Sequence, residues 1–116
     1  MIELPEETIA YITHNGVTVD YASCAFCELF KCEPQDVIDR AVESIIASDD
    51  LRALARLRGQ HIIHAHDDRE YRQQYDFLRF DGTRFWGEAI SKRLPDERYL
   101  TRVEWHYNIG EPFGGK

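Results

Sequence analysis

The sequence lacks the features that would place it in a membrane, on a secretion route or on nucleic acid. None of its apolar runs approaches the roughly 20 residues that span a bilayer, and its acidic N-terminus lacks the basic start of a signal peptide. The formal net charge of −7 argues against non-specific binding to nucleic acid or to an anionic membrane surface. Three cysteines, an odd number, do not indicate a disulfide framework, so we expect a cytoplasmic protein.

Local patterns predict strands toward both ends of the chain and helices between them. Asn-Gly at 15–16 and Asp-Gly at 81–82 are hairpin signals flanked by strand-forming residues. Ser23 can cap a short helix, and Pro34 can open a helical turn. Leucines at helical spacing predict the longest helix from residue 51 onward. Two strands, a helical segment and three strands indicate an α+β domain built on one antiparallel sheet.

Five short motifs along the chain together carry a family resemblance. They are "VDYASCAFCELFKC", "PQDVID", "IIASDD", "LRFDGTRFWGEAIS" and "HYNIGE". In this order and spacing they are similar to the PAS family, including its LOV branch, over residues 8–111. The resemblance implies a five-stranded antiparallel sheet with short helices and one long helix on one face. It also implies a single sensor domain over residues 1–111, with residues 112–116 as a tail or linker.

The chain departs from the family pattern at four positions. Ser23 stands where the family usually has Asn, and Lys31 and Asp39 stand in place of two usual glycines. Asn108 replaces the Asp of the closing motif, which the family often uses in a salt bridge that couples the sheet to an output helix. Asn can keep the hydrogen bonds of that Asp but loses its charge.

The motifs do not support a bound cofactor. Val42 stands at or near the position of the reactive LOV cysteine, so no flavin–cysteine adduct can form there. His61, His64 and His66 fall on the segment where some PAS proteins hold haem, and they could also bind a transition metal. They follow Gly59 and lead into a hydrophilic stretch, so we favour a solvated helix end and predict no cofactor and no metal.

The cysteines offer two interpretations. Cys24 and Cys27 form a C-x-x-C motif, with Cys32 close behind. Cys24 in the first turn of a helix would have its thiol pKa lowered by the helix dipole, which would suit a thiol switch. Free cysteines are more often buried as small hydrophobes, and no second C-x-x-C completes a structural zinc site. We therefore expect packed, unreactive thiols.

The last strand admits two registers. Simple alternation turns Val103, Trp105 and Tyr107 toward the core. The family register instead turns His106 toward a ligand cavity, and we favour it. The residues expected to line the cavity are then Phe77, Phe85, Gly87, Ala89, Ser91, Glu104 and His106. The residues expected to form an apolar outer patch for self-association are Trp86, Ile90, Val103, Trp105 and Tyr107.

The resemblance implies a sensing and regulatory module rather than an enzyme. Such a homodimeric module would bind a small ligand and modulate an output domain, for example a histidine kinase, a cyclase or a transcription factor. A ligand-free structural dimerisation domain is the main alternative, and a haem or flavin sensor is another. A small enzyme that uses His106 and Glu104 as an acid–base pair has no supporting nucleophile, phosphate loop or strong metal motif.

Overall fold

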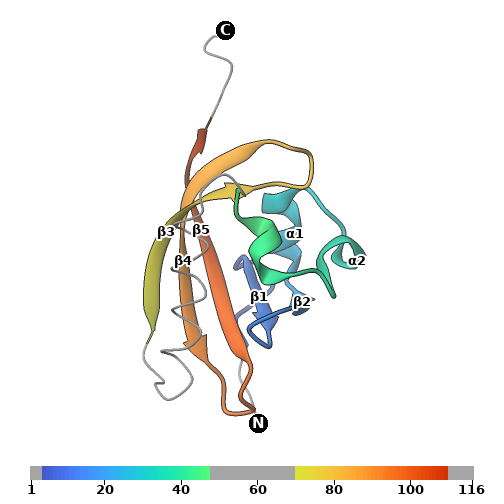
Figure 1. The fold of residues 1–116 in the computed structure, drawn as a ribbon, viewed down its shortest axis with the longest axis vertical. Coiled ribbons are helices and arrows are strands. Elements are labelled where there is room, and N and C mark those ends of the chain that lie inside the picture. Colours follow the sequence, from blue (N-terminus) through green and yellow to red (C-terminus); the bar gives the residue numbers. More distant parts are fainter. Residues whose placement is uncertain (1–3, 48–69, 110–116) are drawn as a thin grey trace, which may run out of the picture.

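One antiparallel sheet with short helices against one face makes up the fold (Figure 1). The computed structural model describes residues 4–47 and 70–109. The sheet order is β2-β1-β5-β4-β3, and the strands are β1 (Tyr11–His14), β2 (Val19–Ala22), β3 (Tyr71–Leu78), β4 (Arg84–Arg93) and β5 (Tyr99–Ile109). The predicted α+β class and five-stranded sheet are confirmed.

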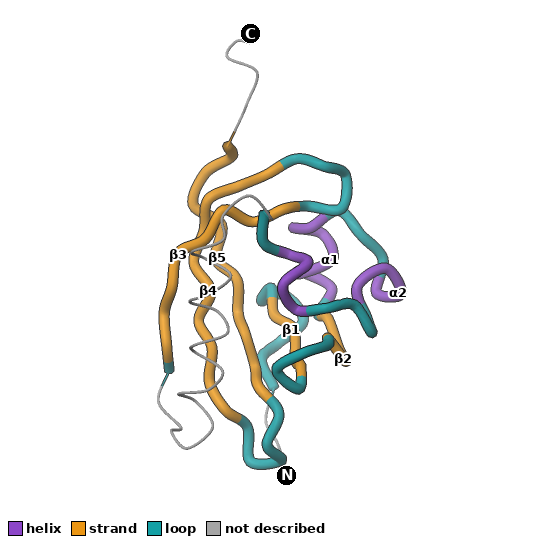
Figure 2. The backbone as a smooth tube through the Cα atoms, in the orientation of Figure 1, coloured by secondary structure: helices purple, strands orange, loops and turns teal. Residues whose placement is uncertain are grey.

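The described helices all lie between β2 and β3 in the chain (Figure 2). They are α1 (Cys24–Phe30), α2 (Pro34–Val37) and the 3₁₀ turn η1 (Val42–Ile45). No helix in this described part is both long and apolar enough to cross a bilayer. The predicted long helix with its three histidines, and the predicted tail, lie outside the described residues.

Local signals explain where α1 begins and ends. Ser23 Oγ accepts a hydrogen bond from the Phe26 N–H at 3.2 Å, which is the predicted N-cap. The helix ends at Lys31, whose φ of 57° is left-handed, and Asp39 also has a positive φ of 72°. These are two of the positions where the resemblance expects glycine. A left-handed conformation costs a residue with a Cβ about 1–2 kcal/mol.

Aromatic rings fill the space between α1 and the sheet. Phe26, Phe30, Phe77 and Phe85 are all fully buried. The Phe77 and Phe85 rings are stacked with centroids 5.1 Å apart, and Phe30 meets both rings edge-on at 5.9 and 5.3 Å. Stacked and edge-on arrangements are the favoured geometries of aromatic pairs. The α1 end of the inner sheet face is therefore solid core.

A bulge in β5 changes which side chains face the core. Ala89 pairs with Val103 and Gly87 with Trp105, but Trp86 pairs with Tyr107, which leaves one extra residue on β5. Residues directly opposite each other share a face of the sheet. Val103 therefore faces inward beside Ala89, and Tyr107 faces outward beside Trp86.

Candidate functional site

The inner face of the sheet holds five of the seven residues predicted to line a cavity. Alternation along β4 turns Phe85, Gly87, Ala89 and Ser91 to this face, and Phe77 pairs with Phe85 from β3. Phe77 and Phe85 are already covered by the α1 rings. Ser91 lies farther along the strand and is buried with 1% exposure. Ser91 is therefore a buried polar residue on this face that lies beyond the aromatic packing beneath α1.

A buried chain of hydrogen bonds crosses the sheet at Ser91. His14 Nε2 lies 2.8 Å from Thr101 Oγ1, which lies 2.8 Å from Ser91 Oγ. All three side chains are buried, and the His14 ring stacks on Tyr99 at 5.5 Å between centroids. The Gly16 N–H donates to His14 Nδ1 at 3.2 Å, so Nδ1 carries no proton. His14 therefore donates from Nε2 to Thr101, which in turn can donate to Ser91.

Within this chain of hydrogen bonds, the Ser91 hydroxyl can supply one further donor. If Thr101 donates to Ser91, the Ser91 hydroxyl proton is available to a further acceptor on the inner face. Sequence reasoning identified Ser91 but missed His14 and Thr101. Simple alternation along β5 would have found Thr101, because it puts Thr101 on the same face as Val103.

Arg79 ties α1 to the end of β5. Its Nη2 donates to Asn108 Oδ1 at 2.8 Å, and its Nε donates to the Leu29 carbonyl oxygen at 2.9 Å. The guanidinium also lies over the Phe85 ring, 4.8 Å from its centroid. Asn108 Oδ1 accepts a second hydrogen bond from Trp105 Nε1 at 3.0 Å. Asn108 therefore accepts two hydrogen bonds at its one oxygen although it lacks the charge of Asp.

Residues 6–104 match the family model of the PAS domain. The chain belongs to the PAS domain family. No curated protein matches it.

Solved structures of PAS domains share the fold at low sequence identity. One is the PAS domain, in complex with ethanol, of a LuxR-family transcriptional regulator from Burkholderia thailandensis, with 19% identity, a TM-score of 0.66, and coverage of 84% of this chain and 88% of that chain. Another is from an HTR-like protein of Haloarcula marismortui, with 14% identity, a TM-score of 0.67 and coverage of 84% and 86%. A third is a domain of a sensor histidine kinase/response regulator from Geobacter sulfurreducens, with 12% identity, a TM-score of 0.65 and coverage of 83% and 82%.

The outer face of this PAS domain carries the two remaining predicted cavity residues. Glu104 pairs with Glu88 across the sheet, and both Glu104 and His106 are exposed. The expectation that they face the cavity is wrong, because Val103 rather than its neighbours holds the inward position. One ligand atom each from Glu88, Glu104 and His106 lie within 4.8 Å of one another. Two carboxylates and an imidazole are donors that could hold a divalent cation, although Arg72 also pairs with Glu88 at 3.6 Å.

The predicted apolar patch is not contiguous. Val103 belongs to the hydrophobic core at 4% exposure, and Ile90 is only 2% exposed. Trp105 and Tyr107 are 49% and 57% exposed, but they lie on opposite faces of the sheet, because the bulge falls between them. The prediction that these five residues form one outer patch is therefore wrong, and self-association stays a prediction.

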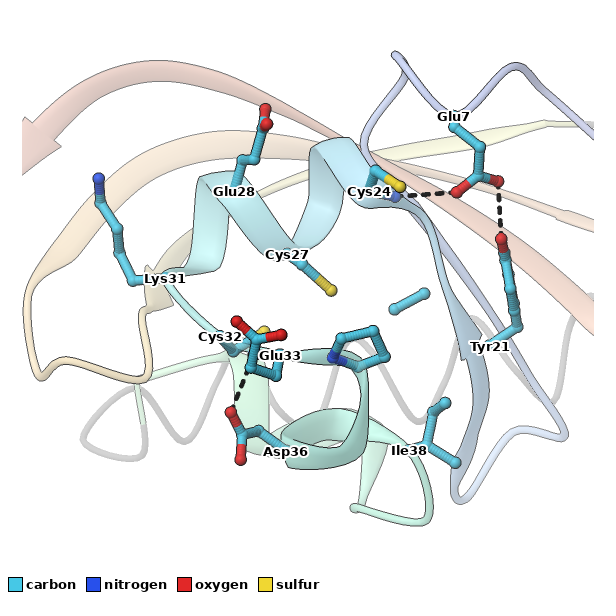
Figure 3. A pocket seen from close by; sticks show the side chains of 12 residues that line it. Glu7, Tyr21, Cys24, Cys27, Glu28, Lys31, Cys32, Glu33, Asp36 and Ile38 are labelled. Carbon is cyan, nitrogen blue, oxygen red and sulfur yellow. Dashed lines mark hydrogen bonds between the residues drawn. The ribbon is translucent and has the colours of Figure 1, made fainter.

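A second feature of the PAS domain is a pocket of about 670 Å³ at α1 and α2 (Figure 3). Cys24, Cys27 and Cys32 all contribute to its wall. A hydrogen bond to the Glu7 carboxylate raises the pKa of the Cys24 thiol, so the predicted lowering by the helix dipole is wrong. Burial raises the pKa of the Cys32 thiol to about 12.

Proposed function

We propose that this PAS domain is a sensing module that binds a small molecule on the inner face of its sheet and thereby regulates an output domain. The His14–Thr101–Ser91 chain carries the proposal. Burying polar groups in an apolar core costs free energy unless each is hydrogen-bonded, and apolar side chains would fill the same space without that cost. A hydroxyl proton left over on Ser91 is of direct use to a ligand that accepts a hydrogen bond.

The ligand that fits this chain is small, neutral and able to accept a hydrogen bond. The described side chains paired with Ser91 across the sheet, Tyr71 and Thr101, and the His14 ring with its hydrogen-bond-accepting Nδ1 offer no formal charge that would attract an ion. The PAS domain of the LuxR-family regulator was solved in complex with ethanol, a molecule of this class. We therefore expect small alcohols, aldehydes or ketones as ligands. Binding would favour one of two packings of the sheet, which is how a ligand shifts a conformational equilibrium.

The proposed output is a kinase, a cyclase or a transcription factor, reached through a homodimer. The structural neighbours include the PAS domain of a transcriptional regulator and a domain of a sensor histidine kinase/response regulator. Trp105 and Tyr107, both about half exposed near the end of β5, offer apolar contact area for a partner. The free cysteines support a reducing, cytoplasmic location.

Ligand titration of matched serine variants tests the proposal. Native mass spectrometry and amide NMR would first identify which alcohol, aldehyde or ketone binds the wild-type domain. Ser91→Ala should then weaken that ligand about five- to tenfold, the loss expected for one hydrogen bond of about 1–1.5 kcal/mol. Ser44→Ala is the matched control, because the half-buried Ser44 lies away from this face in η1 and its hydroxyl donates to the Ala41 carbonyl oxygen. Equal affinities of the two variants, or no binding of any compound, would contradict the proposal.

A ligand-free structural domain is the second candidate, and the aromatic packing favours it. Phe30, Phe77 and Phe85 already fill the inner face beneath α1. On this reading the polar chain only specifies the packing of the strands. Ser91→Ala would then change the stability of the domain, and no compound of the panel would shift its NMR signals.

A further inference from the structure

The end of α1 brings Cys27 and Cys32 together. The Cys32 N–H donates to the Cys27 carbonyl oxygen at 3.0 Å, across the left-handed Lys31. This is the bond of a Schellman motif, in which the side chains at these two positions commonly touch. Covalent geometry and a bond of this length hold the two α-carbons within about 7 Å of each other, the range that a disulfide can span.

The two side chains share one apolar environment. Cys27 belongs to the hydrophobic core cluster, and Cys32 packs against that cluster. Figure 3 shows Cys27 pointing from α1 toward the segment that carries Cys32. Cys24, the other half of the C-x-x-C, is exposed at the start of α1, where its backbone N–H donates to Glu7 Oε1 at 2.9 Å. The sequence motif therefore pairs the wrong cysteines, and the fold pairs Cys27 with Cys32.

Both thiols open onto the pocket between α1 and α2. Cys32 is half-buried, whereas Cys27 is 9% exposed, so a reagent in the pocket meets Cys32 first. The charged residues on the pocket wall are mostly acidic, and they are Glu7, Glu28, Lys31, Glu33 and Asp36. A cationic reagent suits this wall better than an anionic one.

We propose that Cys27 and Cys32 are a site of reversible oxidation, in which a small disulfide entering the pocket converts them to an intramolecular disulfide. The Cys32 thiolate attacks one sulfur of the small disulfide, forms a mixed disulfide and releases one small thiolate. The Cys27 thiolate then attacks Cys32 Sγ, forms the protein disulfide and releases the second small thiolate. The protein loses two protons and two electrons, and the small disulfide is reduced to two thiols.

The reaction is slow at neutral pH, because little of either thiol is ionised there. Burial keeps the pKa of both thiols above the ordinary value, and Glu33 and Asp36 raise both further. Because the thiolate is the nucleophile, the rate should rise about tenfold per pH unit between pH 7 and 9.

Cystamine, a cationic small disulfide, tests the site in a Cys24→Ser background, which removes the exposed thiol. The native protein should lose two hydrogen atoms in its intact mass and give a Cys27–Cys32 cross-linked peptide, and dithiothreitol should reverse both changes. Adding Cys27→Ser should trap one cysteamine on Cys32, because the resolving thiol is gone. Adding Cys32→Ser should abolish the disulfide and leave Cys27 slow to react.

Circular dichroism confirms that each variant is folded, and Cys27→Ala and Cys32→Ala replace any serine variant that is not. Two cysteamine adducts on one native chain, in place of a disulfide, would overturn the proposal. So would a native protein that fails to react at pH 9 while its unfolded form does. In the three-cysteine protein, a disulfide that maps to Cys24 would overturn it as well.

Discussion

Gly87→Ala should destabilise the domain, because a Cβ at this residue would collide with the backbone of β5. A Cβ on Gly87 would lie 2.3 Å from the Glu104 carbonyl oxygen and 3.0 Å from Phe85 Cε1. The first contact is with backbone, so the two strands must move apart at the bulge. Overpacking of this kind destabilises a domain by about 1–3 kcal/mol. Alanine also lowers the conformational entropy of the unfolded chain, which stabilises the fold by about 0.4–1 kcal/mol. A net loss of about 1.3 kcal/mol lowers the melting temperature by about 4–8 °C.

Thermal unfolding and the indole N–H NMR signals are the two readouts for Gly87→Ala. The signal of Trp105 should move, because Trp105 pairs with Gly87 and donates to Asn108. Gly82→Ala is the control, since a Cβ there meets nothing within 4 Å and strains only the turn with its φ of 90°. It should leave the Trp105 signal in place. A Gly87→Ala domain with wild-type stability and an unmoved Trp105 signal would refute the bulge.

Three further substitutions have expected outcomes. Trp105→Glu should leave the domain folded because the indole is 49% exposed, whereas Val103→Asp should unfold it by burying a charge at a position that is 4% exposed, as measured by circular dichroism and urea titration. Asn108→Asp should turn the hydrogen bond from Arg79 into a salt bridge and raise the free energy of unfolding by about 0.5–1 kcal/mol at low salt. Salt at about 1 M should remove this stabilisation. Lys31→Gly should raise the same free energy by about 1 kcal/mol in urea titration, because Lys31 has a left-handed φ of 57°.

Each of these outcomes has a control. Lys31→Ala removes the charge but keeps a Cβ, so a gain in both variants would assign the effect to charge rather than to strain. Asn108→Asp in an Arg79→Ala background should bring no gain, since the partner of the new charge is missing. An unfolded Trp105→Glu domain would place the indole in the core, against its observed exposure.

The sequence predicted features that depend on a few neighbouring residues. Asn15 accepts hydrogen bonds at its side chain from the Val17 and Thr18 N–H groups, and Gly16 has the positive φ that an Asn-Gly turn requires. Ser23 caps α1, as its position before the apolar stripe indicated. Each of these interactions closes within three residues, so its cause is visible in a short stretch of sequence.

Features that depend on pairing between distant strands were not predictable in the same way. The bulge in β5 is defined by the pairing of β5 with β4. It lies beyond Val103, so alternation assigns Val103 to the correct face but not Tyr107. The family register moved Val103 outward and Glu104 and His106 inward, whereas direct alternation was correct as far as Val103. The bond between His14 and Thr101 joins residues 87 positions apart, and no local pattern announces it.

Hydrogen bonds through Arg79 connect the last turn of α1 to the end of β5. The carbonyl oxygens of Leu29 and Phe30, in the last turn of α1, accept hydrogen bonds at 2.9 Å from Arg79 Nε and the Phe80 N–H. Arg79 reaches Asn108 through its other nitrogen, so the α1 terminus and the end of β5 share one rigid, planar guanidinium. A disulfide across the end of α1 would act on β5 through this group, whereas a ligand at Ser91 would act on β5 through Thr101. The two events are coupled if both shift the same equilibrium. The Trp105 indole N–H reports that equilibrium, because it donates to the same Asn108 oxygen as Arg79.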